Sequence, residues 1–120
     1  TVSLYKRSLE LRPRWPYAWA RLSLVKAYRD EYDAEFENAV ERAVQYGPWD
    51  PGVHVTLAEA GIYGWRNLSI PTRKLIAANI HRGLKYEYST MKSIVRRYNG
   101  QILVCGYLPQ DKKTTRFCGW

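Results

Sequence analysis

The sequence feature that most limits the possible fold is an internal repeat with a period near 35 residues. The pairs of residues that are 35 positions apart include Pro13 and Pro48, Pro16 and Pro51, Leu22 and Leu57, and Tyr28 and Tyr63. Self-similarity at a fixed period of roughly 20 to 50 residues is typical of chains built from stacked copies of one supersecondary unit. The sequence therefore predicts a stack of repeated units that fills the chain as one domain, residues 1–120.

Prolines, glycines and asparagines separate intervals that have helical periodicity. The predicted helices cover residues 4–11, 16–28, 34–46, 51–63, 71–84, 88–98 and 101–107. Asp33 and Asp50 are predicted N-caps, because each precedes an apolar helical pattern. No alternating strand pattern occurs. We expect an all-α, antiparallel stack of six to seven helices with this interior: Trp19, Leu22, Phe36, Val40, Leu57, Ile76 and Ile80.

The repeat is similar to the tetratricopeptide pattern, which has a period of about 34 residues and two helices per unit. Trp19, Leu22 and Ser23 match its opening motif, with serine in place of glycine. Several positions depart from the pattern. In the first unit Lys26 replaces a tyrosine, and Phe36 and Val40 replace an alanine and a phenylalanine; in the second unit His54 replaces the tryptophan and residues 65–68 lengthen the turn. The sequence therefore predicts a tetratricopeptide-like (TPR-like) helical stack with one regular and one degenerate unit.

Three segments resemble the VpsP-type polysaccharide biosynthesis proteins: RPRWPYAWARLSLVKA at 12–27, YDAEF at 32–36 and GPWDP at 47–51. The segments RYNG at 97–100 and LVC at 103–105 are similar to the end of that family. The resemblance implies a bacterial protein of exopolysaccharide biosynthesis with an amino-terminal membrane anchor and no catalytic residues. Because the chain begins with Thr1, we expect it to be the C-terminal part of such a protein.

Residues suited to catalysis or metal binding are sparse. Apart from Asp50, the predicted N-cap four residues before His54, neither His54 nor His81 has a cysteine or carboxylate three or four residues away, so a metal site lacks a full set of ligands at helical spacing. No nucleophile elbow or glycine-rich phosphate loop occurs. The sequence therefore predicts a protein that is not an enzyme and has no metal and no cofactor.

The first helix of each tetratricopeptide unit lines a groove that binds a protein segment. The residues predicted to line this groove are Tyr17, Leu24, Tyr28, Glu59 and Tyr63, with Ala20, Ala27, Val55 and Ile62 also facing outward. Under the resemblance, the bound partner belongs to the polysaccharide assembly machinery. The alternative is that these residues pack against a neighbouring unit or the C-terminal tail.

Positive charge is concentrated in the second half, where residues 61–120 contain 11 Lys or Arg and 2 Asp or Glu. The candidate basic patch comprises Arg73, Lys74, Arg82, Lys92, Arg96 and Arg97. Such a patch suits nucleic acid, although no nucleic-acid-binding motif accompanies it. An ordinary solvated surface is an equal alternative. Tryptophan and tyrosine rings can stack on sugar rings, and the repeat does not explain Trp65 and Trp120, so a polysaccharide-binding module is a minor alternative.

Two cysteines, Cys105 and Cys118, enclose a tail in which residues 110–115 are predicted to form a polar turn. A disulfide between them would anchor the apolar end of the chain. Disulfides persist in oxidising compartments, which would agree with a membrane-anchored protein whose domain faces the periplasm. Two reduced, buried cysteines are the alternative.

Overall fold

The computed structural model describes residues 2–120 and is helical throughout, with no strand in that range. The described residues form eight α-helices and one short 3₁₀-helix: α1 (Val2–Leu11), α2 (Pro16–Tyr28), α3 (Ala34–Tyr46), α4 (Pro51–Tyr63), η1 (Trp65–Asn67), α5 (Ile70–Tyr86), α6 (Tyr88–Arg97), α7 (Gln101–Cys105) and α8 (Lys112–Cys118). The all-α prediction is confirmed, and the predicted number of helices is one too low.

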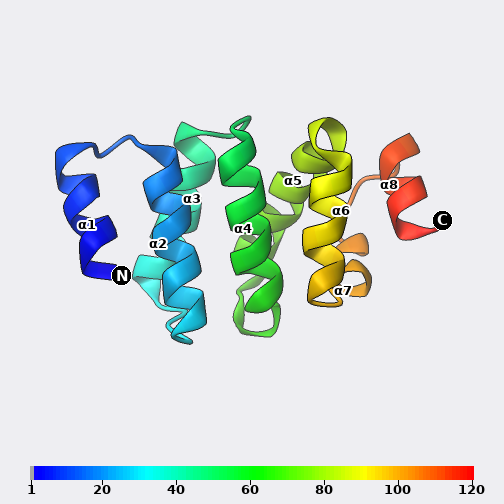
Figure 1. Ribbon diagram of the computed structural model, residues 1–120. Coiled ribbons are helices and arrows are strands. Elements are labelled where there is room, and N and C mark those ends of the chain that lie inside the picture. The colour runs from blue at the N-terminus through cyan, green and yellow to red at the C-terminus, as the bar shows by residue number, and fades with distance from the viewer. Residues whose placement is uncertain (1) are drawn as a thin grey trace.

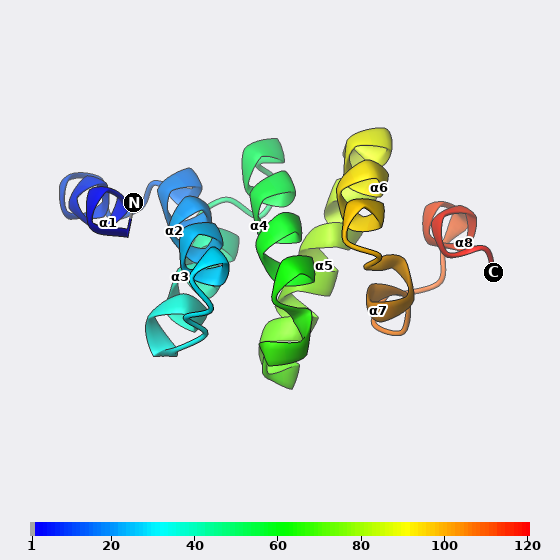
Figure 2. The ribbon, with the colours of Figure 1, turned by 60° about the horizontal axis from the view of Figure 1, so that its bottom comes forward.

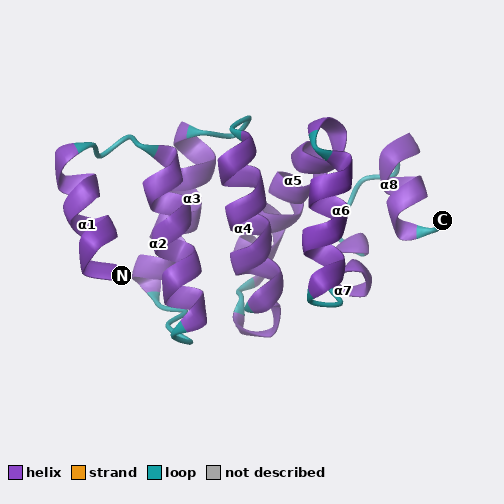
Figure 3. Ribbon diagram, in the orientation of Figure 1, coloured by secondary structure: helices purple, strands orange, loops and turns teal. Residues whose placement is uncertain are grey.

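The helices form an elongated stack of 43 × 25 × 22 Å. Figure 1 shows α2, α4 and α6 side by side, with α3 and α5 behind them and with α1 and α8 at the two ends. The turned view keeps this order, and short loops join successive helices (Figures 2 and 3). α2 packs against α1, α3 and α4, while α4 also packs against α5 and α6. Each helix of the front row is therefore covered on several sides.

Side-chain caps fix where the helices begin. The Asp33 carboxylate accepts a hydrogen bond from the backbone N–H of Phe36, and Asp50 accepts from Gly52 and Val53. Both caps were predicted, and each satisfies backbone donors that have no partner within the helix. α5 begins one residue before Pro71, because the Ser69 hydroxyl caps it.

The C-terminal tail differs from the prediction. The predicted polar turn at 110–115 overlaps α8, whose N-cap is Asp111. Asp111 and Thr114 form a capping box: the Asp111 carboxylate accepts a hydrogen bond from the backbone N–H of Thr114, and the Thr114 hydroxyl accepts one from the backbone N–H of Asp111. Phe117 is fully buried, so α8 packs its apolar side against the body of the protein.

The core contains nearly all of the predicted interior. The fully or almost fully buried members are Leu22, Phe36, Val40, Leu57, Ile76 and Ile80. Trp19 is only partly buried, and its indole N–H donates to the carbonyl of Pro13 at 2.8 Å. Gly61 allows α4 and α5 to approach closely, because a Cβ there would lie 2.3 Å from Cγ2 of Ile76.

Lys26 is buried although it is charged. Its Nζ lies 2.7 Å from Glu35, 3.0 Å from Asp33 and 3.3 Å from Glu31. These carboxylates belong to the loop after α2 and the start of α3, so the ammonium group joins the two helices. The hydrogen bonds and charges offset the cost of taking the ammonium out of water.

Candidate functional site

Three tyrosines form a continuous row at one end of the front helices. Tyr28 and Tyr63 are the last residues of α2 and α4, and Tyr98 follows α6. The ring centroids of Tyr28 and Tyr63 are 5.0 Å apart, and those of Tyr63 and Tyr98 are 5.8 Å apart. Both pairs are edge-to-face, an arrangement that aromatic quadrupoles favour. Tyr28 is 46% exposed and Tyr63 is 44% exposed, so these two rings face solvent, whereas Tyr98 is partly buried.

Glu59 links the outer members of this row. Its carboxylate accepts a hydrogen bond from the Tyr28 hydroxyl, and the Tyr98 hydroxyl lies 3.5 Å from the same oxygen. The sequence placed Glu59 on this surface but identified no partner for it. Tyr98 was missed, although its spacing of 35 residues from Tyr63 repeats the spacing between Tyr28 and Tyr63. The period was therefore a signal that could have identified it.

A hollow of about 560 Å³ adjoins the tyrosine row. Its lining includes Tyr63 and Tyr98, together with Ile102 and Leu103 of α7. Ile102 is 89% exposed, which leaves an aliphatic side chain in solvent next to aromatic rings. We call Tyr28, Tyr63, Tyr98 and Ile102 the tyrosine surface.

The other predicted groove residues are not on this surface. Leu24 is only 3% exposed, and three further positions predicted to face outward are also buried: Ala20, Ala27 and Ile62. These predictions were wrong because α1, α3 and α4 cover most sides of α2, and because α4, which contains Ile62, is itself covered by α2, α5 and α6. Tyr17 is exposed but lies near the opposite end of α2, roughly 16 Å along the helix axis from Tyr28.

The predicted basic patch is not one surface. Arg73 donates to the carbonyl of Trp65 at 3.1 Å and lies over its ring, so it has a structural contact. Arg82 donates to the carbonyl of Pro48 at 2.7 Å, and burial lowers the pKa of its guanidinium. Lys74 is exposed on α5. Arg73 and Arg82 are therefore held by internal contacts, and Lys74 lies on a different helix from the other three predicted cations.

Lys92, Arg96 and Arg97 do lie together. They line a groove of about 570 Å³ between α6 and α8, which we call the cationic groove. Arg116 of α8 is a further member of this lining that sequence reasoning did not include. Arg116 reaches the groove only because the C-terminal tail folds back against the other helices, and no local sequence pattern indicates that the tail does so.

The two histidines each contact a carboxylate that is distant in sequence. Nδ1 of buried His54 lies 2.9 Å from Glu87, and Nε2 lies 2.7 Å from the carbonyl of Pro48. Nε2 must carry a proton, because a carbonyl only accepts, so this nitrogen faces the backbone instead of a nucleophile. His81 lies 2.6 Å from Asp111. Within residues 2–120, no group of three or more His, Cys, Asp or Glu could hold a metal ion.

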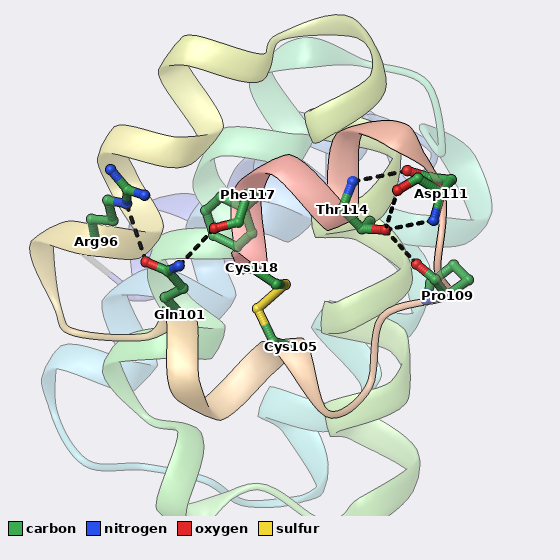
Figure 4. The surroundings of a disulfide bond; sticks show 8 residues. All are labelled: Arg96, Gln101, Cys105, Pro109, Asp111, Thr114, Phe117 and Cys118. Atoms are coloured by element: carbon green, nitrogen blue, oxygen red, sulfur yellow. Dashed lines mark hydrogen bonds between the residues drawn. A yellow bond between two sulfur atoms is a disulfide. The ribbon is translucent and has the colours of Figure 1, made fainter. Parts of the chain in front are cut away.

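A disulfide joins Cys105 of α7 to Cys118 of α8, with 5.9 Å between their Cα atoms. Figure 4 shows the disulfide between the two helices, with Gln101 on one side of it and the Asp111–Thr114 cap on the other. Of the two alternatives that the sequence left open, the structure contains the bonded one. The disulfide holds the end of the chain against α7.

The chain matches no family model, and no characterised protein or solved structure is significantly similar to it. No helix in residues 2–120 has the length and apolar character needed to cross a membrane. The functional assignment below therefore depends on the surfaces just described and on the sequence resemblance.

Proposed function

We propose that this chain is a non-enzymatic, tetratricopeptide-like scaffold that positions a protein partner through the tyrosine surface. The observation that carries the proposal is the row of Tyr28, Tyr63 and Tyr98, in which the first two rings are exposed and Tyr98 is partly buried. Tyrosine is enriched in the energetically dominant parts of protein interfaces, because it combines a large apolar area with a hydroxyl group. A row spread over three helices suits an extended partner segment better than a small molecule.

The tetratricopeptide-like assignment is supported by the spacing of the front helices. The first residues of α2 and α4 are 35 positions apart, and so are their last residues. A regular repeat places equivalent side chains beside one another, which is how such stacks build extended binding surfaces. Glu59 then fixes the orientation of the tyrosine rings from the middle helix.

The biological setting that we propose is exopolysaccharide biosynthesis or export in the bacterial cell envelope, with this domain in the periplasm. The resemblance to VpsP-type proteins supports the pathway. The disulfide supports an oxidising compartment, because such bonds are rare in the cytosol. A nucleic-acid-binding role receives less support, because two of the six predicted basic residues make internal contacts instead.

Site-specific photocrosslinking in cells that carry the gene tests the proposal. A photoreactive phenylalanine derivative replaces Tyr63 in one variant and Gln45, which is exposed on α3, in the control. We expect a protein of the polysaccharide assembly machinery to crosslink at position 63 and not at position 45. The crosslinked protein is identified by mass spectrometry.

The partner found in this way is then tested with purified Tyr63→Ala and Tyr28→Ala variants. Each truncation should weaken binding by about tenfold or more if the row is central to the interface. Crosslinking to glycan without protein would refute the scaffold and favour the polysaccharide-binding alternative. Equal crosslinking at both positions would show that the tyrosine surface has no special role.

A further inference from the structure

The side chains lining the cationic groove are suited to bind an anion. On α6, Ser89, Lys92, Ser93 and Arg96 lie at steps of three, one and three residues, which places them on one side of the helix. Two hydroxyl groups therefore alternate with two cations along the floor of the groove. No acidic residue is part of its lining.

The opposite side of the groove is supplied by α8. The guanidinium carbon of Arg116 lies 4.7 Å from the ring centroid of Tyr88, and Nζ of Lys92 lies 5.9 Å from the same centroid. Tyr88 thus gathers two cations from different helices at one place. Arg116 is held there because its neighbour Phe117 is buried and Cys118 is disulfide-bonded.

Gln101 connects the two sides of the groove. It accepts a hydrogen bond from Nε of Arg96 at 3.2 Å and donates from Nε2 to the carbonyl of Phe117 at 2.6 Å (Figure 4). One amide group therefore orients the guanidinium of α6 and binds the backbone of α8. The arrangement holds Arg96 and Arg116 in a fixed relation.

Within residues 2–120, no carboxylate forms an ion pair with the cations of the groove. The only carboxylates in residues 61–120 are Glu87 and Asp111, and each contacts a histidine. No ion pair within the described residues involves Lys92, Arg96, Arg97 or Arg116. Cations gathered by other contacts repel one another, and a bound anion would relieve that repulsion.

We propose that the cationic groove binds a phosphate group. A phosphate monoester carries about −1.5 to −2 charges near neutral pH and offers three acceptor oxygens. Arg96 and Arg116 supply planar guanidinium donors, Lys92 supplies a point charge, and the serine hydroxyls supply further donors. A carboxylate has one charge and two oxygens, so it would leave more of these groups without a partner.

Phosphate, and not a nucleobase or a sugar ring, is the group that the groove recognises. Tyr88 is the only aromatic residue in its lining, and Lys92 and Arg116 already contact that ring. Its face is therefore not free to stack on a ligand. Binding should depend on the phosphate group and be insensitive to the identity of an attached base.

Isothermal titration with inorganic pyrophosphate tests this site. At about 50 mM salt, where screening is modest, we expect one pyrophosphate to bind per chain with saturation. Arg116→Gln and Arg96→Gln should each weaken binding about tenfold, because each removes a charge-assisted hydrogen bond. Lys74→Gln is the matched control, since it removes one exposed charge from α5 outside the groove, and it should change the affinity less than about twofold.

Two competition experiments identify where the phosphate comes from. A short oligodeoxythymidylate that carries a 5′-phosphate and vesicles that contain phosphatidic acid are compared at equal concentrations of phosphate monoester, because each carries the dianionic group that the groove should recognise. The better competitor indicates whether a nucleotide chain or a lipid headgroup supplies the group, and failure of both indicates a small phosphorylated ligand.

Two results would overturn the proposal. Equal weakening by Arg116→Gln and Lys74→Gln would mean that pyrophosphate responds only to net charge. Displacement of pyrophosphate by acetate at equal ionic strength and concentration would mean that the groove does not distinguish phosphate from carboxylate. Circular dichroism of each variant verifies that the helices are intact before the affinities are compared.

Discussion

Removing the disulfide should measurably destabilise the whole domain. The perturbation is the double substitution Cys105→Ser and Cys118→Ser, which eliminates a bond between residues separated by 13 positions. Closing a loop of this size reduces the entropy of the unfolded chain, and the chain-entropy relation gives about 3 kcal/mol of stabilisation. The packing of Phe117 remains, so α8 should still form in the native state.

This free energy corresponds to a large change in melting temperature. Unfolding entropy near the midpoint is about 2.1 cal/mol/K per residue, so a loss of about 3 kcal/mol in a 120-residue chain lowers Tm by about 12 °C. Thermal unfolding followed by circular dichroism without reductant measures the difference. Adding reductant should move the native protein toward the variant and leave the variant unchanged.

A change in Tm below about 4 °C would refute this reasoning, since it would mean that the tail unfolds before the rest of the domain. In that case the disulfide would constrain a tail that is already unfolded at the midpoint of the main thermal transition. Hydrogen exchange at the amides of α8 shows whether α8 unfolds separately or together with the rest of the domain. Protection factors equal to those of α4 would show that the tail belongs to the same cooperative unit.

Three further substitutions test packing, ion pairing and capping. Gly61→Ala should destabilise the domain by about 1–3 kcal/mol although alanine has the better helix propensity, because the added Cβ would collide with Ile76. The control, Gly106→Ala, should be neutral or slightly stabilising because no atom lies close to the added Cβ. Urea unfolding measures the stability of both variants. Lys26→Met should cost about 2 kcal/mol in the same assay, because it removes the cation that three neighbouring carboxylates share and leaves only two of them with another cation, Glu31 with Arg29 and Glu35 with Lys6. Asp111→Ala should cost about 1 kcal/mol at neutral pH. Backbone and His81 hydrogen bonds lower the pKa of Asp111 to about 2, so its contribution is complete above the unfolded pKa near 3.8 and disappears as pH falls toward 2; variant and native stabilities measured across that range should converge.

The parts of the fold that sequence reasoning predicted correctly depend on local signals. Asp33 and Asp50 precede apolar helical patterns, and their carboxylates cap helices in the structure as predicted. Prolines in the first turns mark where α2, α4 and α5 begin. The burial of Leu22 and Leu57 followed from the period, because equivalent positions in stacked units meet the same kind of neighbour.

The orientation of α2 could not be predicted in the same way. Apolar residues cover nearly all sides of this helix, so its periodicity does not show which side faces solvent. Leu24 was therefore placed on the groove, although the neighbouring helices cover it. α8 was missed for a related reason, because a helix of seven residues is not stable by itself and depends on contacts made by the folded chain.

The two candidate surfaces also differ in whether the sequence could have predicted their residues. Tyr98 was predictable from the period alone, whereas Arg116 joins the cationic groove only because the tail folds back and is held by Cys118. The surfaces also meet, since Arg96 lines the groove and shares a second, smaller hollow with Ile102 of the tyrosine surface. A ligand that occupies one surface would therefore reach the edge of the other at the turn between α6 and α7. Binding at the tyrosine surface and phosphate binding should accordingly be measured together, because reciprocal changes in affinity are the thermodynamic sign of coupling between them.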